Sequence, residues 1–499
     1  MEAVRSFHLD QRGWAIATAG LACIAVLTWL SLEIPKGTLV ATDELLTAER
    51  SREMLTQGSW LVHFNFRPSF EKPPLQYWLT AWTLPRFENP SLAVRIWPLI
   101  YAALTAIVLG WLVWAMRPDR PWLIPLSIAL LFSSPLFATQ ATRGLLDVGL
   151  AFFTTTTILF SELARKRPMW WLAVAASCWL ASLQKNPLPF LVWLLILAVR
   201  FSSPSERDRL KSRWLWFSFL VAVVAISAWP LLQLIKYQMP WWSVFHEEVI
   251  VWLGPVGLGA RPYFEIPIRM VINGGLFGLL ALLAPFVILF SRKETESPAT
   301  REIALVSVIM IVLAIVSNFR HVRYIIPIVP TLCLLIAFVF YSLIERRRRI
   351  RGLTAFLVLL LVAGFIETKI QIDHLEGKDD RNDPINALIP AFTVPKDVTD
   401  EKLIAEKLGT LQQNGTKIVL VKAIKPGAGL LWDSFYLFHG RLRSSVTKYT
   451  VDEIHANPPQ PPLIGACVSR DLPVLQQLYP NLEAQLTRAQ FVCWEVAVQ

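Results

Sequence analysis

Long apolar segments recur along most of this sequence, and they constrain its fold more than any other feature. The chain of 499 residues is 54% hydrophobic and only 17% charged. A soluble chain of this length would carry many more charges, whereas an apolar run of about 20 residues can cross a bilayer. We therefore predict a polytopic α-helical membrane protein, with spans near residues 13–33, 93–116, 121–140, 145–164, 168–184, 187–203, 214–236, 268–291, 302–319, 324–345 and 352–370.

Basic residues alternate with the predicted spans. If the N-terminus is cytoplasmic, the inside loops hold most of the Lys and Arg, including the run at 346–351. Cytoplasmic loops retain such charges, so the pattern predicts a cytoplasmic N-terminus and, after about eleven spans, an extracytoplasmic tail. The net charge of +11 then reflects orientation in an inner (plasma) membrane, and we expect no nucleic-acid partner. The first run lacks a small-residue cleavage site and is interpreted as a retained span.

The composition changes near residue 371, where apolar runs shorten to strand length. We predict a transmembrane domain over 1–370, with extracytoplasmic loops at about 34–92 and 237–267, and a small α/β domain over 371–499. Within the tail we expect a helix at 400–413, ended by Asn414-Gly415. The expected strands are 417–423, 434–438, 463–468 and 490–497.

Ionisable side chains at the outer membrane level are the strongest functional signals. Such groups are costly there unless they line a polar cavity. Asp147 needs a cation, a metal or water, and Arg143 one helical turn earlier offers a purely structural partner. The full set is Asp43, Glu44, Glu71, Lys72, Arg143, Asp147, Lys185, Arg261, Arg320 and Arg323.

The first outer loop contains two charged pairs. Asp43 and Glu44 are either solvated charges at the start of a helix or a catalytic pair. Glu71 and Lys72 either pair with each other or are oriented for function by the stiff prolines that follow. Between the pairs, residues 45–57 predict an amphipathic helix lying on the membrane.

Three further residues have two readings each. Lys185 is either a lipid-headgroup anchor or a site residue. Arg261, in a Gly-rich loop, suits a loop that closes on a phosphate or an interfacial arginine. Tyr324 points into a cavity or belongs to an aromatic girdle.

Metal and thiol chemistry is weakly indicated. His246, Glu247 and Glu248 could bind a divalent metal together with Asp43, but neither spacing nor ligand number requires one. No other cofactor is expected. Cys467 and Cys493 lie in the polar tail, where an oxidising compartment would permit a disulfide.

These motifs resemble a known family. DELLTAERSREMLTQGSWLV at 43–62 and FEKPPLQYWLTA at 70–81 resemble the first periplasmic loop of the integral-membrane GT-C glycosyltransferases. The similarity is to bacterial transferases related to the lipid A 4-amino-4-deoxyarabinose transferase and, more distantly, to protein O-mannosyltransferases. Supporting matches are RGLLDVGLAFF at 143–153, QKNP at 184–187, GARPYF at 259–264 and RYIIPIVP at 323–330. Together they cover roughly residues 10–370.

The resemblance implies an inverting hexosyl- or pentosyltransferase that takes a sugar from a polyprenyl-phosphate carrier. The acceptor would be lipid A, a glycan or another extracytoplasmic molecule. Asp43 would be the catalytic carboxylate, and Lys72 and Arg261 would hold the phosphate. The pocket would also include Glu71, Asp147, Lys185 and Tyr324, with Glu44, Arg143 and Arg320 as secondary candidates.

Two alternatives stay open. One is a protein O-mannosyltransferase-like enzyme, and the other is a transporter or flippase of lipid-linked sugars. Transporters often contain repeats with broken helices, and this sequence shows no repeat. Many relatives carry a His-Asn pair and an Arg in the long loop, where this chain has FHEEVIVW at 245–252. The resemblance therefore implies neither a metal nor the aminoarabinose sugar.

Overall fold

The computed structural model describes residues 2–39, 42–239, 265–291, 298–316, 322–346, 350–375, 398–421 and 433–497. The chain forms two compact units. The first comprises Met1–Pro35, Phe70–Gln76 and Arg95–Ile372, and the second comprises Lys36–Ser69, Tyr77–Val94 and Asp373–Gln499. The chain passes between them after Pro35 and Ser69, and within three helices: α3 (Leu75–Thr83), α4 (Pro90–Met116) and α17 (Ile350–Leu375).

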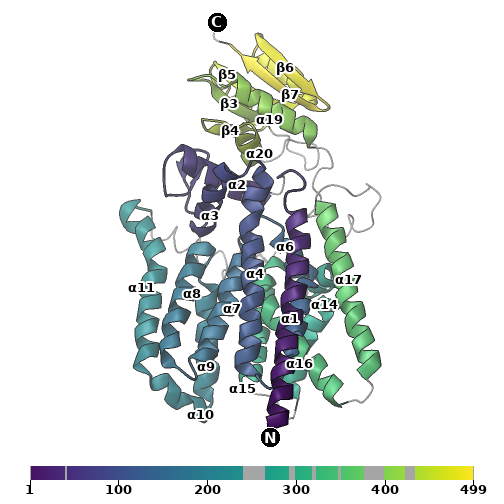
Figure 1. The fold of residues 1–499 in the computed structure, drawn as a ribbon. Helices are drawn as coiled ribbons and strands as arrows, with labels where there is room; N and C mark the ends of the chain where they lie inside the picture. Colours follow the sequence, from purple (N-terminus) through teal and green to yellow (C-terminus); the bar gives the residue numbers. More distant parts are fainter. Residues whose placement is uncertain are drawn as a thin grey trace. The chain divides into compact units, whose positions relative to one another are not determined.

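The first unit is a bundle of helices (Figure 1). Helix α7 packs against α8 and α9, α14 packs against α15 and α16, and α1 packs against α5. Besides most of α4, the helices are α1 (Glu2–Glu33), α5 (Leu123–Phe132), α6 (Pro135–Ala141), α7 (Asp147–Leu163), α8 (Trp171–Gln184), α9 (Leu188–Ser202), α10 (Pro204–Arg207), α11 (Arg213–Lys236), α14 (Glu265–Phe290), α15 (Pro298–Val316), α16 (Val329–Arg346) and α17 (Ile350–Leu375). Short 3₁₀ helices are η2 (Pro168–Trp170), η3 (Asp208–Lys211) and η5 (Val322–Ile328).

Within the described residues, each predicted span falls on helix, although 121–140 covers two helices, α5 and α6, that are bent by 68°. Among the described residues, six helices are long and apolar enough to cross a membrane, or seven if the bent pair α5 and α6 forms one span. Apolar helix α9 is shorter. Exposed apolar side chains such as Leu21, Val224 and Phe290 cover the outer faces of these helices, as expected of a surface that faces lipid. The protein is therefore a multi-pass membrane protein.

A buried ion-pair network joins three helices of the first unit. Arg200 on α9 donates two hydrogen bonds of 2.9 Å to the Glu302 carboxylate on α15, and a third of 2.8 Å to the Ser161 carbonyl on α7. Arg165 donates to Glu302 as well, at 2.7 Å. Because Glu302 is buried, these donors compensate its desolvation and fix the helices against one another.

The second unit contains a five-stranded sheet in the order β4-β3-β5-β7-β6. Strands β4, β3 and β5 are parallel, and β7 pairs antiparallel with β5 and β6. Its strands are β3 (Lys417–Val421), β4 (Val446–Tyr449), β5 (Leu463–Val468), β6 (Leu482–Arg488) and β7 (Phe491–Val496). Its helices are α19 (Thr399–Leu411), α20 (Asp433–His439), α21 (Val451–Ala456) and α22 (Leu472–Leu478), with short η7 (Ser469–Asp471).

Most of the first outer loop belongs to this second unit, whereas its segment Phe70–Gln76 belongs to the first. It contributes α2 (Thr42–Thr56), a hairpin of β1 (His63–Phe64) and β2 (Arg67–Pro68), most of α3, and η1 (Leu84–Arg86). The expected helix at 45–57 is present, but its predicted placement on the membrane is wrong. Leu45 and Ala48 are fully buried in a protein core with side chains of α19, α20 and the sheet.

Sequence patterns identified most elements of the tail. The helix at 400–413 and strands near 417–423, 463–468 and 490–497 are confirmed, whereas 434–438 is helix α20 and not a strand. Strands β3 and β4 are parallel neighbours, so their connection must cross over, and a helix usually makes that crossing. The segment 434–438 suggested a strand because its apolar run is of strand length, and a short apolar run cannot be distinguished from a buried helix by its pattern.

The two tail cysteines cannot bridge. On β5 and β7, Ala466 stands opposite Cys493, and Cys467 opposite Val492. Neighbouring residues of a strand face opposite sides of the sheet, so the two thiols enter different cores, Cys493 with Ala466 and Cys467 with Val492. Both are free cysteines.

Candidate active site

The first turn of α2 carries two carboxylates. Asp43 is half-buried and Glu44 is buried. The Asp43 carbonyl accepts a hydrogen bond of 3.0 Å from the Thr47 hydroxyl, which stiffens this end of the helix. Carboxylates are favoured here because the first turn has unpaired N–H groups and a positive dipole end. Both interpretations of Asp43 from the sequence, helix-end charge and functional acid, fit this position.

Segment Phe70–Gln76 lies in the first unit and carries the second charged pair. Glu71 is exposed and Lys72 is half-buried, whereas Pro73 and Pro74 are buried and lead directly into α3. Proline fixes φ and pre-organises the start of a helix. The buried prolines therefore hold the backbone that carries Lys72.

An ion pair joins the start of α7 to the end of α8. Nζ of Lys185 donates to Oδ1 of Asp147 at 2.5 Å, and both side chains are less than 10% exposed. Lys185 follows the last residue of α8, while Asp147 is the first residue of α7. This burial excludes Lys185 as a simple lipid-headgroup anchor. Arg143, which the sequence suggested as a partner of Asp147, is also buried and lies in the turn that follows α6.

Two further cations act on this pair. Burial lowers the pKa of Lys185; Asp147 opposes that effect, and the positive charges of Arg323 and Lys72 reinforce it. The Tyr324 ring on η5 lies near two cations, with its centroid 5.5 Å from Nζ of Lys185 and 5.7 Å from Cζ of Arg323. Positive side chains gathered in this way favour an anionic ligand.

A buried glutamine beside Lys185 joins three parts of the first unit. The Gln184 side-chain amide donates to Gln76 Oε1 at 3.0 Å and to the Leu146 carbonyl at 3.3 Å. Its own oxygen accepts from the Tyr101 hydroxyl at 3.4 Å. These bonds connect the segment that carries Lys72 to both ends of the Asp147–Lys185 pair. Sequence reasoning missed Gln184 and Gln76 because neutral amides gave no charge signal.

Gly149 makes space for this network. A Cβ atom at residue 149 would overlap the side-chain amide of Gln184, which would have to shift, and would lie 3.0 Å from the Tyr101 ring. Glycine two residues after Asp147 therefore leaves room for this amide, although glycine weakens a helix interior. The RGLLDVGLAFF motif carries both residues.

Several candidates lie outside the described residues. They are Arg261, Arg320 and the possible metal ligands His246, Glu247 and Glu248. Within the part of the chain that the structure describes, no group of three His, Cys, Asp or Glu side chains is arranged to hold a metal ion.

Known structures share this architecture. The chain superimposes on ArnT from Cupriavidus metallidurans, solved bound to undecaprenyl phosphate, with a TM-score of 0.70 at 17% identity, over 97% of this chain and 98% of that one. The chain has the GT-C fold. The resemblance noted in the sequence is thereby confirmed for the fold, including the strands of the C-terminal domain.

Sequence comparisons agree with the GT-C fold. Residues 47–242 match the family model for dolichyl-phosphate-mannose-protein mannosyltransferases. An undecaprenyl phosphate-α-4-amino-4-deoxy-L-arabinose arabinosyl transferase of Pseudomonas savastanoi is 29% identical over 311 residues, 58% of this chain and 55% of that protein. A similarly named transferase of Sodalis glossinidius is 32% identical over 183 residues, 35% of this chain and 33% of that protein. The chain thus spans a third to about half of these curated relatives.

Proposed function

We propose that this protein is an inverting glycosyltransferase that uses a polyprenyl-phosphate sugar donor. The observation that carries the proposal is the buried Asp147–Lys185 pair in a membrane protein, on which the positive charges of Arg323 and Lys72 also act. A lipid phosphate supplies the matching negative charge, and its apolar tail is suited to a site among membrane helices. The GT-C fold and the transferase names of the relatives support the same assignment.

In the proposed reaction, Asp43 accepts the proton of an acceptor hydroxyl as its oxygen attacks the anomeric carbon. The bond from that carbon to the phosphate oxygen breaks, and the polyprenyl phosphate leaves with the bonding electrons. Lys72, Lys185 and Arg323 stabilise the negative charge that develops on this leaving group. Arg261 would add a further cation. A phosphate leaves readily, so this scheme needs no strong general acid.

The proposed orientation has a cytoplasmic N-terminus and an extracytoplasmic tail in an inner membrane, because basic residues alternate with the spans. The acceptor is then extracytoplasmic, and lipid A, a glycan and a protein hydroxyl are its candidate classes. The family match at 47–242 favours testing a protein acceptor beside lipid A.

The test uses purified full-length protein with a panel of undecaprenyl-phosphate sugars, and it follows release of the lipid phosphate with each acceptor class. Asp43→Asn should reduce turnover by about 10²-fold or more, the usual contribution of a general base. Lys72→Ala should raise the donor KM. Asp208→Asn, at a fully exposed aspartate, is the matched control and should behave as wild type.

Two results would reject the proposal. Wild-type turnover by Asp43→Asn would remove the base, and movement of lipid-linked sugars across vesicles without transfer would indicate a transporter instead. Unchanged donor dependence in Lys72→Ala would remove Lys72 from the phosphate site.

A further inference from the structure

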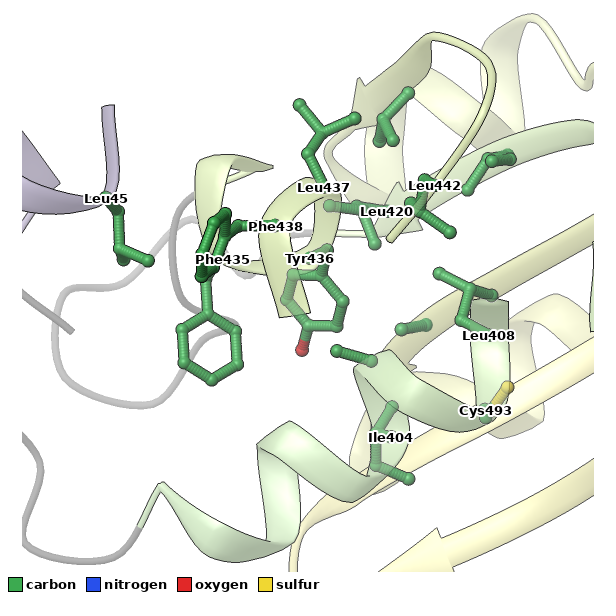
Figure 2. Close-up of a cluster of buried hydrophobic side chains, with 14 of the residues drawn as sticks. Leu45, Ile404, Leu408, Leu420, Phe435, Tyr436, Leu437, Phe438, Leu442 and Cys493 are labelled. Carbon is green, nitrogen blue, oxygen red and sulfur yellow. The ribbon is translucent and has the colours of Figure 1, made fainter. Parts of the chain in front are cut away.

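The C-terminal domain and the first outer loop share one hydrophobic core. Leu45 and Ala48 of α2, together with Leu39 and Val94, belong to the same buried cluster as residues of α19, α20 and the sheet. Figure 2 shows Leu45 beside Phe435 and Phe438 of α20, with Tyr436, Leu437 and Leu442 further into the cluster. The apolar face of α2 is therefore completed by residues about 390 positions later in the chain.

A polar clamp accompanies this core. The hairpin turn Asn65-Phe66 has positive φ at both residues, 53° and 62°, as a two-residue hairpin requires. Its Asn65 amide donates to the Val446 carbonyl at 2.9 Å, and its oxygen accepts from the Val446 N–H at 2.7 Å. Asn65 thus pairs with the first residue of β4 as a neighbouring strand would.

The same turn is tied back to α2. The Glu53 carboxylate accepts a hydrogen bond of 2.8 Å from the Phe66 N–H. On the helix itself, Arg52 is held by two bonds to Glu49 and donates a third, of 2.9 Å, to the Leu442 carbonyl beyond α20. Helix α2 is therefore attached to the tail domain in two ways. Arg52 bonds to it directly, and Glu53 holds the hairpin turn whose Asn65 pairs with Val446.

Helix α2 has little stability of its own. It has 15 residues, near the length below which isolated helices are marginal in water. Glu44, Glu49, Arg50 and Glu53 are all buried, so the helix needs surrounding protein to compensate its charges. Its position is consequently set by what it packs against.

We infer that the C-terminal domain is the positioning element for the catalytic carboxylate on α2, acting through Asn65 and the Leu45 core. This inference rests on the proposed role of Asp43. It assigns the tail to the chemical step, because Asp43 lies in the first turn of the helix that the tail holds. The proposed phosphate ligands Lys72, Lys185 and Arg323 belong to the other unit.

Weakening the contacts that hold α2 should therefore lower kcat while leaving the donor KM nearly unchanged. The base would be misplaced in the transition state, while the donor phosphate keeps its own partners. A small displacement of a reacting group is enough to slow catalysis strongly.

Two variants test this in the full-length protein. Asn65→Gly removes both hydrogen bonds to Val446 and keeps the positive φ, which glycine adopts without strain. Leu45→Ala removes buried side-chain atoms from the shared core. The matched control is Leu475→Ala, also fully buried in this unit but in the separate core on the other side of the sheet. Kinetics use the donor found active in the sugar panel, and hydrogen exchange monitors the α2 amides.

We expect Asn65→Gly and Leu45→Ala to lower kcat at least about fivefold, with donor KM within about twofold and faster exchange in α2. Leu475→Ala should keep kcat within about twofold. Equal losses in all three variants would show only a general need for a folded tail and would overturn the inference. Faster α2 exchange with normal kcat would overturn it too.

These outcomes are separable from failure of the proposed function. If Asp43→Asn turns over normally, both ideas fall. If Asp43→Asn is inactive while Asn65→Gly and Leu45→Ala keep normal kcat, the glycosyltransferase assignment stands and the positioning role falls. Absence of turnover with every donor would reject the assignment and this inference with it.

Discussion

Lys185 and Asp147 form a buried ion pair of 2.5 Å although they lie 38 residues apart. The pair connects the end of α8 to the start of α7. Because both side chains are buried, the stability of each charge depends on the other. Removing Lys185 leaves Asp147 desolvated and without its contact partner, with Arg323 and Lys72 as the remaining cations. Removing both charges leaves a neutral contact.

We predict that Lys185→Met lowers the free energy of unfolding by up to about 3–5 kcal/mol, because Asp147 remains buried and loses its contact partner, while Arg323 and Lys72 offset part of the loss. The double variant Asp147→Asn/Lys185→Met should recover a large part of that loss. Thermal unfolding in detergent measures both. A double variant less stable than Lys185→Met would contradict the pairing, and neither protein should bind lipid phosphate as wild type does.

Gln184 and Gln76 should be energetically coupled. Gln184→Leu leaves the Gln76 oxygen without its 3.0 Å donor, at a cost of about 1–3 kcal/mol. In the double variant with Gln76→Leu, the combined loss should be smaller than the sum by about 0.5 kcal/mol or more. Strict additivity would show that the contact is not formed. Gly149→Ala should resemble Gln184→Leu, since the added methyl displaces the same amide.

The second unit should lose stability in mild acid. Burial lowers the pKa of His439 to about 4, from 6.5 for an exposed histidine, so the folded state favours the neutral ring. The neutral His439 ring stabilises the folded state fully above pH about 6.5. As the pH falls to about 4, the free energy of unfolding decreases by about 1–3 kcal/mol.

His439→Gln should flatten this pH dependence, since glutamine has no charge to gain and can still donate to the Leu39 carbonyl, which lies 3.0 Å from Nε2. Exchange of the β3 and β5 amides, corrected for the intrinsic pH effect, gives the readout. The same acid sensitivity in wild type and variant would assign the effect to other groups.

Cys467 and Cys493 should remain thiols and react slowly. Burial raises the pKa of each to about 12, so at pH 8 only about one in 10⁴ is a thiolate. Iodoacetamide should label neither of these two thiols before the protein unfolds. The electrophoretic mobility of the denatured protein should be the same with and without reductant. Oxidation that consumes both thiols in the folded protein would contradict the opposite orientation of the two side chains.

Apolar periodicity predicted the helical framework well, because a membrane span depends on length and local composition alone. The tail strands 417–423, 463–468 and 490–497 were equally visible in local patterns. The segment 434–438 was assigned wrongly, because its local composition suits a strand, whereas it forms helix α20 in the crossover between the parallel strands β3 and β4.

The candidate site was only partly predictable. The sequence marked Asp147 and Lys185 separately, because buried charges are conspicuous in apolar runs. It suggested Arg143 as the partner of Asp147, since local spacing cannot show that another helix ends nearby. Gln184 and Gln76 carry no charge, and only their mutual hydrogen bond reveals them. The surroundings of α2 depend on contacts with the tail, which no local pattern encodes.

The clamp at Asn65 also constrains how the protein is made. Its partner, Val446, is synthesised 381 residues later, and the Arg52 contact at Leu442 closes across 390 residues. On the ribosome, α2 emerges long before the strands that complete its core. The first outer loop therefore stays incompletely packed until nearly the whole chain has been translated. A nascent chain that stops before β4 would carry α2 without the strands that support it. A stop codon that truncates the chain before Val446 should therefore yield a membrane-inserted but incompletely folded protein.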